Sequence, residues 1–541
     1  MNFNIKKYQL ILISIFSGLL MAAAWPDYGW SWIIFISWVP MLFVEDYIFQ
    51  NKTFFSRGAI VLYSYPGFLV WNIITTWWVS NSTMIGGVVA FVLNSLFMAL
   101  TFGLYHLIRK KVFPQGKGYF VLIALWFSYE YLHMNWEITW SWLVLGNVFA
   151  SSYKWIQWYE FTGVFGGGLW ILLVNILIFN FLSEILNKKI TKGKMIFSVV
   201  KILSLILLPI VISMFMYNKY QEKGDKAIIV VVQPDIDPFN EEFTTPASDL
   251  LNNMLSLARQ KVDENTDMIF FPETSIPQNI WESDFGLTYV YDSLELFFKS
   301  YNNRFPIVLG MSTQKLFSKT QERDVAAREF PNSEGSFYVS YNTATFVKPG
   351  GEISFYHKAK LVPGVERMPY PKLLKPLEKL SIDLGGSSGS LGASKVREVF
   401  QWQKVKVGPI ICYESIYGEF VAGYVRNGAN MLAIITNDGW WGDTQGHKQH
   451  YTYARLRAIE NRRDIARAAN TGNSGFFNQS GDDFLKTEYW VPGVEKKEVY
   501  LNDEITFYTK YGDYLARFSM LISAFLILIY LSMILKIKNK P

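Results

Sequence analysis

Long apolar segments are the feature that most restricts how this chain can fold. A helix of about 17–25 apolar residues is needed to cross the roughly 30 Å hydrocarbon core of a bilayer. Of all residues, 50% are hydrophobic and 17% are aromatic, which is more than an ordinary soluble protein carries. We therefore expect an α-helical membrane bundle of about eight spans. The predicted spans cover residues 8–24, 31–44, 59–80, 85–107, 118–135, 160–183, 196–216 and 515–535.

Two apolar stretches allow another interpretation. The first, "NIKKYQLILISIFSGLLMAAAW", has the basic start, apolar middle and small residues of a signal peptide. We favour a retained span, because further apolar segments follow it at once. Residues 136–159 are apolar but interrupted by Gly and polar residues. They favour a re-entrant or interfacial stretch over a regular span.

The basic residues between the spans predict the orientation of the chain. Lys and Arg gather in "RKK" at 109–111, "NKKITKGK" at 187–194 and "KIKNK" at 536–540, while the alternate loops "PDYGWS" and "SNSTM" carry none. Because Lys and Arg are retained on the cytoplasmic side of a membrane, we expect both termini in the cytoplasm. The polar stretch between the seventh and eighth spans then lies outside it.

That polar stretch is long enough for one domain with its own core. Its apolar, β-branched runs, such as 227–233, 405–412 and 430–438, alternate with helical patterns, which is typical of a covered α/β sheet. A hairpin is predicted about Gly350–Gly351, and a mobile Gly/Ser-rich loop at 381–395. We predict three segments: a membrane bundle at 1–216, an extracytoplasmic α/β domain at 217–510, and a last helix with a tail at 511–541.

Three strand ends in this domain carry reactive side chains. Glu273 stands in "FFPETSIP", Lys358 in "FYHKAKLVP" and Cys412, the only cysteine of the chain, in "GPIICYES". Functional side chains of α/β sheets tend to lie where strands end. Taken singly, each residue has a plainer interpretation, because a lone Cys is usually an inert buried thiol and an acid or Lys after a strand is usually just solvated.

The sequence offers little for a metal, a cofactor or a nucleic acid. His447, His450 and Asp443 are close enough in sequence to suggest a metal site, but we favour histidines that cap or line a helix. The basic run 455–467 has aliphatic residues at helical spacing and reads as a solvated helix face. With one Cys, there is no Cys-rich metal motif and no internal disulfide. We expect no cofactor, no metal and no nucleic-acid partner.

The strings "PETSIP", "YHKAKLVPGVERMP", "ICYES" and "TNDGWWGD", in this order, resemble the carbon–nitrogen hydrolase (nitrilase) superfamily over 225–500. The resemblance implies a four-layer α-β-β-α sandwich with a Glu–Lys–Cys triad, here Glu273, Lys358 and Cys412. The chemistry suits these residue types, because a thiol attacks a carbonyl only as thiolate and needs a base. Glu273 is the expected base, and Lys358 favours the thiolate and the oxyanion, with the Tyr413 N–H as a second oxyanion donor.

The placement of this domain between membrane spans resembles the apolipoprotein N-acyltransferase family, as do 136–147, 160–170 and 507–518. The resemblance implies transfer of the sn-1 acyl chain of a phospholipid, such as phosphatidylethanolamine, to the Cys and then to the N-terminal amine of a diacylglyceryl apolipoprotein. It implies a multi-pass protein of the bacterial inner membrane with a periplasmic catalytic domain. We expect a monomer. Six supporting positions also match the family's motifs: Glu366, Tyr413, Glu414, Asn437, Trp441 and Trp142.

The sequence departs from the family at two places and leaves two other functions open. It reads "VPGVE" for the usual "VPFGE", and "QPDIDPFNEEF" lacks the expected tryptophan, with Phe239 or Phe243 as stand-ins. A membrane-tethered amidase would pass the thioester to water instead. An inactive sensor with the same fold is disfavoured by the complete set of Glu273, Lys358 and Cys412.

Overall fold

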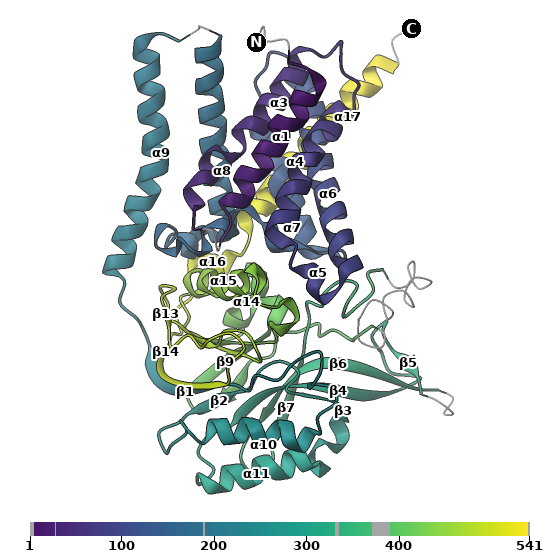
Figure 1. Cartoon of the computed structure of the whole chain (residues 1–541), viewed down its shortest axis with the longest axis vertical. Helices are drawn as coiled ribbons and strands as arrows, with labels where there is room; N and C mark the ends of the chain where they lie inside the picture. Colours follow the sequence, from purple (N-terminus) through teal and green to yellow (C-terminus); the bar gives the residue numbers. More distant parts are fainter. Residues whose placement is uncertain (1–4, 27–28, 188–189, 331–334, 371–389, 539–541) are drawn as a thin grey trace. The chain divides into compact units, whose positions relative to one another are not determined.

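The computed structural model describes residues 5–26, 29–187, 190–330, 335–370 and 390–538. The chain divides into two compact units. Figure 1 labels their helices and strands and colours the chain by residue number. The membrane unit comprises Met1–Trp77, Gly87–Lys219 and Tyr511–Pro541, and the catalytic unit comprises Trp78–Gly86 and Tyr220–Lys510. The Gly/Ser-rich loop predicted at 381–395 lies, as far as residue 389, outside the described residues.

The membrane unit is a set of apolar helices, which confirms the predicted helical membrane part. Within the described residues, six stretches are long and apolar enough to cross a bilayer, while α1 and α7 have only 17 and 16 residues. The total of eight crossings stays a prediction. The helices are α1 (Lys7–Ala23), α2 (Ile34–Ser37), α3 (Val39–Gln50), α4 (Ala59–Thr76), α6 (Met84–Val112), α7 (Phe120–Asn135), α8 (Tyr159–Leu186), α9 (Lys192–Lys219) and α17 (Tyr514–Lys538).

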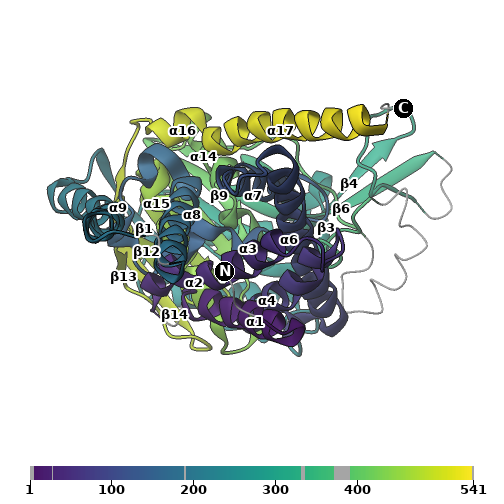
Figure 2. The same cartoon turned by 90° about the horizontal axis from the view of Figure 1, so that it is seen from above.

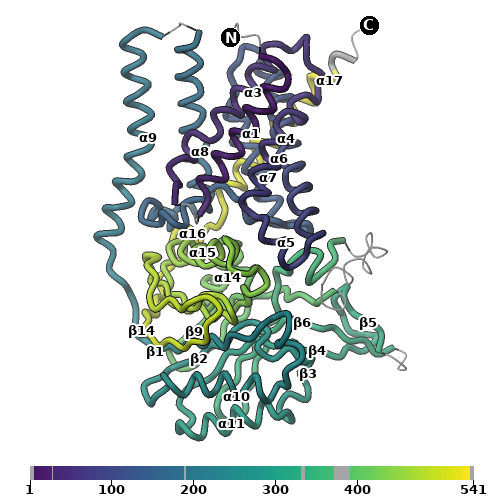
Figure 3. The backbone as a smooth tube through the Cα atoms, in the orientation of Figure 1, coloured from purple at the N-terminus to yellow at the C-terminus, as the bar shows by residue number. Residues whose placement is uncertain are grey.

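Small residues allow these helices to approach closely. α1 and α4 lie side by side (Figure 3) and meet where a Cβ on Gly18 would lie 2.1 Å from the Gly67 carbonyl oxygen. α17 packs along α7 (Figure 2). The Ser128 hydroxyl donates to Ser523 Oγ at 2.9 Å between these two helices. Close backbone approach and interhelical hydrogen bonds are the usual adhesion between helices in lipid, where no hydrophobic effect joins them.

The stretch between α7 and α8 contains short 3-10 turns in place of a helix: η2 (Ser141–Leu143), η3 (Leu145–Ala150) and η4 (Tyr153–Trp155). This agrees with the broken pattern of its sequence. The backbone of Leu145 donates to Glu130 Oε1 at 2.9 Å. Irregular backbone at membrane depth needs such partners within the protein, because lipid offers none.

The catalytic unit contains two β-sheets among its described residues. The first has the order β14-β1-β2-β4-β6-β5, with β3 paired to β4 and β7 paired to β6, and the second has the order β13-β12-β11-β10-β9-β8. The strands of the first sheet are β1 (Asp225–Gln233), β2 (Met268–Phe270), β3 (Ile276–Trp281), β4 (Ile307–Ser318), β5 (Arg328–Glu329), β6 (Ser336–Val347), β7 (Ile353–His357) and β14 (Gly493–Leu501). Those of the second are β8 (Phe400–Trp402), β9 (Val405–Ile411), β10 (Met431–Thr436), β11 (Ile465–Ala469), β12 (Gly475–Phe477) and β13 (Asp483–Phe484).

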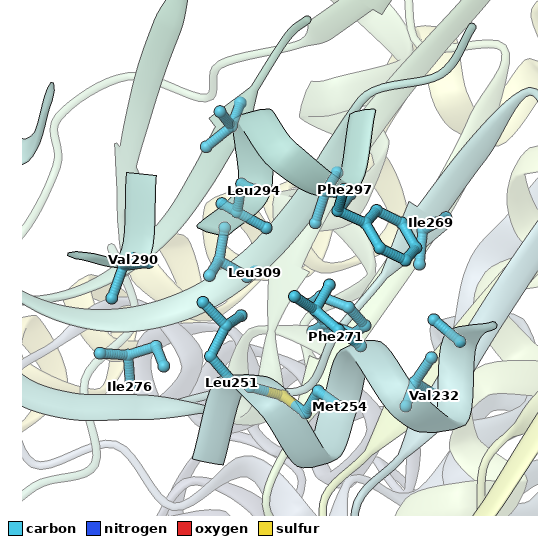
Figure 4. Packing of buried hydrophobic residues seen from close by; sticks show 14 of the residues in the cluster. Val232, Leu251, Met254, Ile269, Phe271, Ile276, Val290, Leu294, Phe297 and Leu309 are labelled. Carbon is cyan, nitrogen blue, oxygen red and sulfur yellow. The ribbon is translucent and has the colours of Figure 1, made fainter. Parts of the chain in front are cut away.

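Helices cover the outer face of each sheet, which gives the predicted α-β-β-α layering (Figure 1). α10 (Ala247–Ala258) and α11 (Tyr289–Ser300) lie on the first sheet, and α14 (Gly418–Arg426) and α15 (Gln445–Asn461) lie on the second. Leu251 and Met254 of α10 and Phe297 of α11 are buried against Phe271 and Leu309 of the sheet layer (Figure 4). Burying such side chains is the main force that holds these layers together, at about 1.5–3 kcal/mol each.

The predicted hairpin is present as β6 and β7. Both turn glycines, Gly350 and Gly351, have positive φ, at 90° and 96°. A side chain at either position would be strained there. The hairpin matters for the site because its second arm ends directly before Lys358.

Candidate active site

The three predicted reactive residues lie at the ends of three strands from both sheets. Glu273 follows β2, Lys358 follows β7 and Cys412 follows β9. All three are buried, with exposed fractions of 6%, 1% and 8%. The structure brings them together, because Lys358 pairs with Glu273 and both charges act on the Cys412 thiol.

Glu273 accepts three hydrogen bonds. Its Oε1 binds Lys358 Nζ at 2.9 Å and Asn342 Nδ2 at 2.8 Å, and its Oε2 binds the backbone N–H of Asn437 at 3.0 Å. These donors come from three separate elements, so they fix both the position and the rotation of the carboxylate. A general base must be held in this way to take a proton along one direction.

Lys358 is an ammonium ion between two carboxylates. Its Nζ lies 2.9 Å from Glu273 Oε1 and 2.8 Å from Glu366 Oε1. Burial alone lowers the pKa of Lys358, but Glu273, Glu366 and Cys412 outweigh that effect and raise it well above its usual value. Lys358 therefore stays charged at any physiological pH, and it can stabilise negative charge that develops beside it.

The loop that carries Glu366 adapts to the altered "VPGVE" sequence. Gly364 has a φ of 80° and donates its N–H to the Arg367 carbonyl at 2.8 Å, which closes the turn. Glu366 Oε2 accepts from the Val362 N–H at 2.7 Å, while Asn342 Nδ2 reaches Glu366 Oε1 at 3.1 Å. The exchange of residues before Glu366 therefore leaves its side chain on Lys358. Asn342, which bridges both carboxylates, lies in a strand interior and gave no sequence signal.

Cys412 stands in a strained turn and is a neutral thiol at rest. Its φ is 49°, a left-handed conformation that costs a residue with a side chain about 1–2 kcal/mol. Burial and the charge of Glu273 raise the pKa of Cys412 well above its usual value, although Lys358 and the Thr436 hydroxyl act in the opposite direction. Attack by this thiol therefore needs a base that removes its proton, and the assignment of that role to Glu273 stays a prediction.

Glu414 ties two of the strand ends to each other. It is fully buried, and its Oε1 accepts from the Tyr356 hydroxyl and the Ala359 N–H, both at 2.6 Å. Its Oε2 accepts from the Ile411 N–H at 2.9 Å. Since Ala359 follows Lys358 and Ile411 precedes Cys412, one carboxylate sets the spacing of both residues. The neighbouring Tyr413 is buried, with its ring 5.3 Å from that of Tyr417.

Asn437 links the site to a buried acid that sequence reasoning missed. Its Nδ2 donates to Glu242 Oε2 at 2.9 Å, while its backbone N–H binds Glu273. Glu242 is 2% exposed, and burial together with the charge of Glu273 raises its pKa well above the usual value. The pair "EE" at 241–242 reads as a solvated turn, so nothing in the sequence marked one member as buried.

Trp441 contacts a segment of the chain that sequence reasoning assigned to the membrane. Its ring lies 4.7 Å from that of Trp78, and its carbonyl accepts from Asn81 Nδ2 at 2.8 Å. Trp78 and Asn81 belong to the catalytic unit, although they lie between α4 and α6 in the chain. The prediction of a span over 59–80 was therefore wrong at its end: α4 stops at Thr76, and Trp78 already belongs to the catalytic unit.

The predicted stand-ins for the missing tryptophan, Phe239 and Phe243, are exposed and face another tryptophan. Their rings lie 5.1 Å and 6.5 Å from that of Trp440. Substrate contact by either ring stays a prediction. Trp142 belongs to the membrane unit, where it is buried and stacks on Trp140 at 5.9 Å, and its supporting role also stays a prediction.

The two histidines of α15 have different partners. His447 lies 3.1 Å from Asp443 and 3.1 Å from Asn473, whereas His450 lies 2.8 Å from Asp438. Within the described part of the chain, no three His, Cys, Asp or Glu side chains are grouped so that they could hold a metal ion. The side chains that the structure groups at the site offer a thiol, carboxylates and an ammonium group.

Comparison with known proteins defines the class first. The family model for the carbon-nitrogen hydrolases matches residues 229–523, and that for the apolipoprotein N-acyltransferase N-terminal domain matches residues 17–177. An amidase from Nesterenkonia sp. is similar in structure, with a TM-score of 0.36 and 15% identity, over 55% of this chain and 97% of the amidase. The two family matches define the class of this protein, a carbon–nitrogen hydrolase domain joined to a helical membrane part.

The relatives narrow that class to one family. The apolipoprotein N-acyltransferase of Chlorobaculum tepidum is 30% identical over 513 residues, which cover 93% of this chain and 92% of that protein. That of Geobacter metallireducens is 26% identical over 521 residues, with the same two coverages of 93% and 92%. The chain belongs to the apolipoprotein N-acyltransferase family, which confirms the resemblance seen in its motifs. It is a multi-pass acyltransferase of the bacterial inner membrane that acts in lipoprotein biosynthesis.

Proposed function

We propose that this enzyme moves a fatty acyl chain from a phospholipid to the N-terminal amine of a diacylglyceryl apolipoprotein through a thioester on Cys412. The observation that supports this most is the buried grouping of Glu273, Lys358 and Cys412, with Lys358 Nζ 2.9 Å from the Glu273 carboxylate. One site that serves two acyl-bearing lipids in turn suits a covalent intermediate.

In the first half-reaction, Glu273 takes the Cys412 proton as Sγ attacks the sn-1 ester carbonyl. The negative charge that forms on the carbonyl oxygen is stabilised by the Lys358 ammonium group and by the Tyr413 N–H. The tetrahedral intermediate then loses the glycerol oxygen, which takes the proton back from Glu273. The products are the Cys412 thioester and a lysophospholipid, and no proton is gained or lost.

In the second half-reaction, the acceptor amine attacks the thioester carbonyl. An α-ammonium group must first lose one proton to become a nucleophile, and this proton leaves to solvent. The attacking nitrogen loses a second proton to Glu273, which returns it to the Cys412 thiolate as the amide forms. The cycle therefore regenerates the thiol and releases one proton for each amide made.

The orientation that we propose follows from the basic loops and the spans. Both termini face the cytoplasm, and the catalytic unit lies on the periplasmic side. The proposed boundaries are 1–216, 217–510 and 511–541, apart from residues 78–86, which belong to the catalytic unit. We further propose that the enzyme acts as a monomer. Both proposed substrates are lipids, and each reaches the single active site by diffusion within the bilayer.

The experiment supplies purified protein in detergent with phosphatidylethanolamine labelled in its sn-1 chain and a diacylglyceryl-cysteine peptide. The proposal predicts label in an amide on the peptide, and no amide with Cys412→Ala. Cys412→Ser is a matched variant that keeps the volume of the side chain but not its nucleophilicity. Release of free fatty acid without peptide amide, or full activity of Cys412→Ala, would overturn the proposal.

A further inference from the structure

A buried series of hydrogen-bonded polar groups lies next to the backbone carbonyl of the proposed nucleophile, Cys412. His450 Nδ1 lies 2.8 Å from Asp438 Oδ1, and His450 Nε2 lies 2.8 Å from Ser415 Oγ and 3.2 Å from the Cys412 carbonyl oxygen. The Ser415 hydroxyl donates to the same carbonyl at 2.7 Å. Asp438, His450 and Ser415 are each fully buried. Nothing in the reaction described above uses them.

At the end of this series farthest from Cys412, Asp438 is a carboxylate that stays negatively charged. Arg467 pairs with Asp438 Oδ2, and the Thr436 hydroxyl donates to Asp438 Oδ1 at 2.8 Å. Burial raises the pKa of Asp438, but Arg467 and His450 outweigh it and lower that pKa well below its usual range. A carboxylate only accepts hydrogen bonds, so the Nδ1–H of His450 donates to Asp438. The Ser415 hydroxyl has one proton and gives it to the Cys412 carbonyl, so the 2.8 Å contact between His450 Nε2 and Ser415 Oγ needs a proton on Nε2 as well, which also faces that carbonyl. The His450 ring is thereby held with Nε2 facing Ser415 and the Cys412 carbonyl.

The Cys412 carbonyl matters because of the peptide group to which it belongs. The C=O of Cys412 and the N–H of Tyr413 share one planar peptide unit and point in opposite directions. Whatever fixes the direction of this carbonyl therefore also fixes the direction of the Tyr413 N–H. The left-handed φ of 49° at Cys412 is a conformation that persists only where its surroundings hold it.

We propose that His450 and Ser415 clamp the Cys412 carbonyl and thereby aim the Tyr413 N–H at the oxyanion of the acyl-transfer intermediates. His450 is then a positioning residue, which acts through a peptide group and does not touch the substrate. The inference rests on the proposed function, since it needs Cys412 as the nucleophile. Trp441 supports the clamp from the side, with its ring 5.5 Å from that of His450 in an edge-on contact.

The only cysteine of the chain allows a test that separates aiming the N–H from merely holding the fold. Acyl transfer builds an oxyanion, but alkylation of Cys412 by iodoacetamide displaces iodide at a saturated carbon and builds none. Loss of one oxyanion donor costs about 10²–10³-fold in rate. We expect His450→Gln and Ser415→Ala to lower kcat for transfer by about 10²-fold. The rate of Cys412 alkylation should change by less than about 3-fold, since the thiol itself keeps its neighbours.

His447→Gln is the matched control. His447 lies on the same helix, is also buried, and bonds to Asp443 and Asn473. Its transfer rate should stay within about 3-fold of the parent's. Thermal unfolding of each variant shows that the fold is kept, and Ser415→Ala, the smaller change, remains informative if His450→Gln does not fold.

Two results would overturn the inference. Equal losses of transfer and alkylation mean that the clamp places the thiol and not the N–H. Unchanged transfer in both variants means that there is no functional clamp. The proposed function is judged separately, by Cys412→Ala: if that variant keeps transfer activity, then the nucleophile is wrong, whereas an inactive Cys412→Ala beside a fully active His450→Gln defeats only the clamp.

Discussion

Glu414→Gln tests whether a buried carboxylate that takes no part in the proposed reaction holds the reacting residues in place. Glu414 Oε1 binds the Tyr356 hydroxyl and the Ala359 N–H, and Oε2 binds the Ile411 N–H and the Tyr424 hydroxyl, the last at 3.3 Å. Glutamine keeps one of the two oxygens and replaces the other with an NH₂ group. The tyrosine hydroxyl on that side can turn and accept from it, but the backbone N–H cannot.

The expected loss of unfolding free energy follows from the number of donors that lose their acceptor. One buried backbone N–H loses its charged acceptor and is left unsatisfied, which costs about 1–3 kcal/mol, toward the upper end because the lost partner is charged. A loss near 3 kcal/mol corresponds to a fall in Tm of about 6 °C for a domain of this size. Because the affected N–H belongs to Ala359 or Ile411, the end of β7 or of β9 shifts. We therefore expect transfer to fall by at least about 10-fold, as misplaced reacting groups lose rate steeply.

The assay compares Glu414→Gln with Glu398→Gln in the same detergent, by thermal unfolding and by peptide amide formation. Glu398 is exposed, so its variant loses the same charge without a buried contact and should match the parent in both measurements. If Glu414→Gln kept the Tm and the activity of the parent, then the carboxylate would not tie the two strand ends, and the reasoning would fail.

Three other changes have expected outcomes. Glu273→Gln removes the charge that raises the pKa of Cys412, so alkylation at pH 8 should become faster while transfer is lost; slower alkylation would contradict this electrostatic account. Asp464→Asn tests the pH dependence of stability. Burial raises the pKa of Asp464 to about 8, above its unfolded value near 4. The parent should therefore lose stability as pH rises from about 4 through 8, and Asp464→Asn should have the higher Tm at pH 9 but a similar one at pH 5. Gly446→Ala places a Cβ 2.6 Å from Trp78 Cδ2, which should cost about 1–3 kcal/mol by overpacking and lower the Tm, whereas Gly286→Ala, with open space around it, should not.

The sequence predicts those parts of the site that can be inferred from a residue and its immediate neighbours in the chain. Glu273, Lys358 and Cys412 each follow an apolar strand, and each strand end is visible as the point where hydrophobic residues stop. Local patterns also predict the hairpin at Gly350–Gly351, because a turn with positive φ selects glycine.

Contacts between distant residues were not predictable in the same way. Asn342 reaches the carboxylate of Glu273, and Glu242 reaches the side chain of Asn437, from positions whose own neighbours look like an ordinary strand and an ordinary turn. His450 shows the same limit, since its partners Asp438 and Ser415 are 12 and 35 residues away. Such contacts depend on how strands and helices are placed in the sheet, and a single sequence does not encode that placement locally.

Two elements were misjudged for a different physical reason. Strand β14 reads "GVEKKEVYL", and its charged residues hide a strand from a search for continuous apolar runs, although it pairs with β1 along its whole length. Residues 78–86 lie between two apolar helices, so hydropathy assigned the first of them to a span. Polar contacts such as that of Asn81 with Trp441 place the segment in the catalytic unit instead.

The central claim is that Cys412 carries the acyl chain between the two substrates, and mass spectrometry of the digested protein tests it most directly. Incubation with phosphatidylethanolamine alone should add the mass of one acyl group to the Cys412 peptide. Hydroxylamine or a diacylglyceryl-cysteine peptide should remove that group, and Cys412→Ala should never gain it. An acyl group on another residue, or peptide amide formed by Cys412→Ala, would contradict the account.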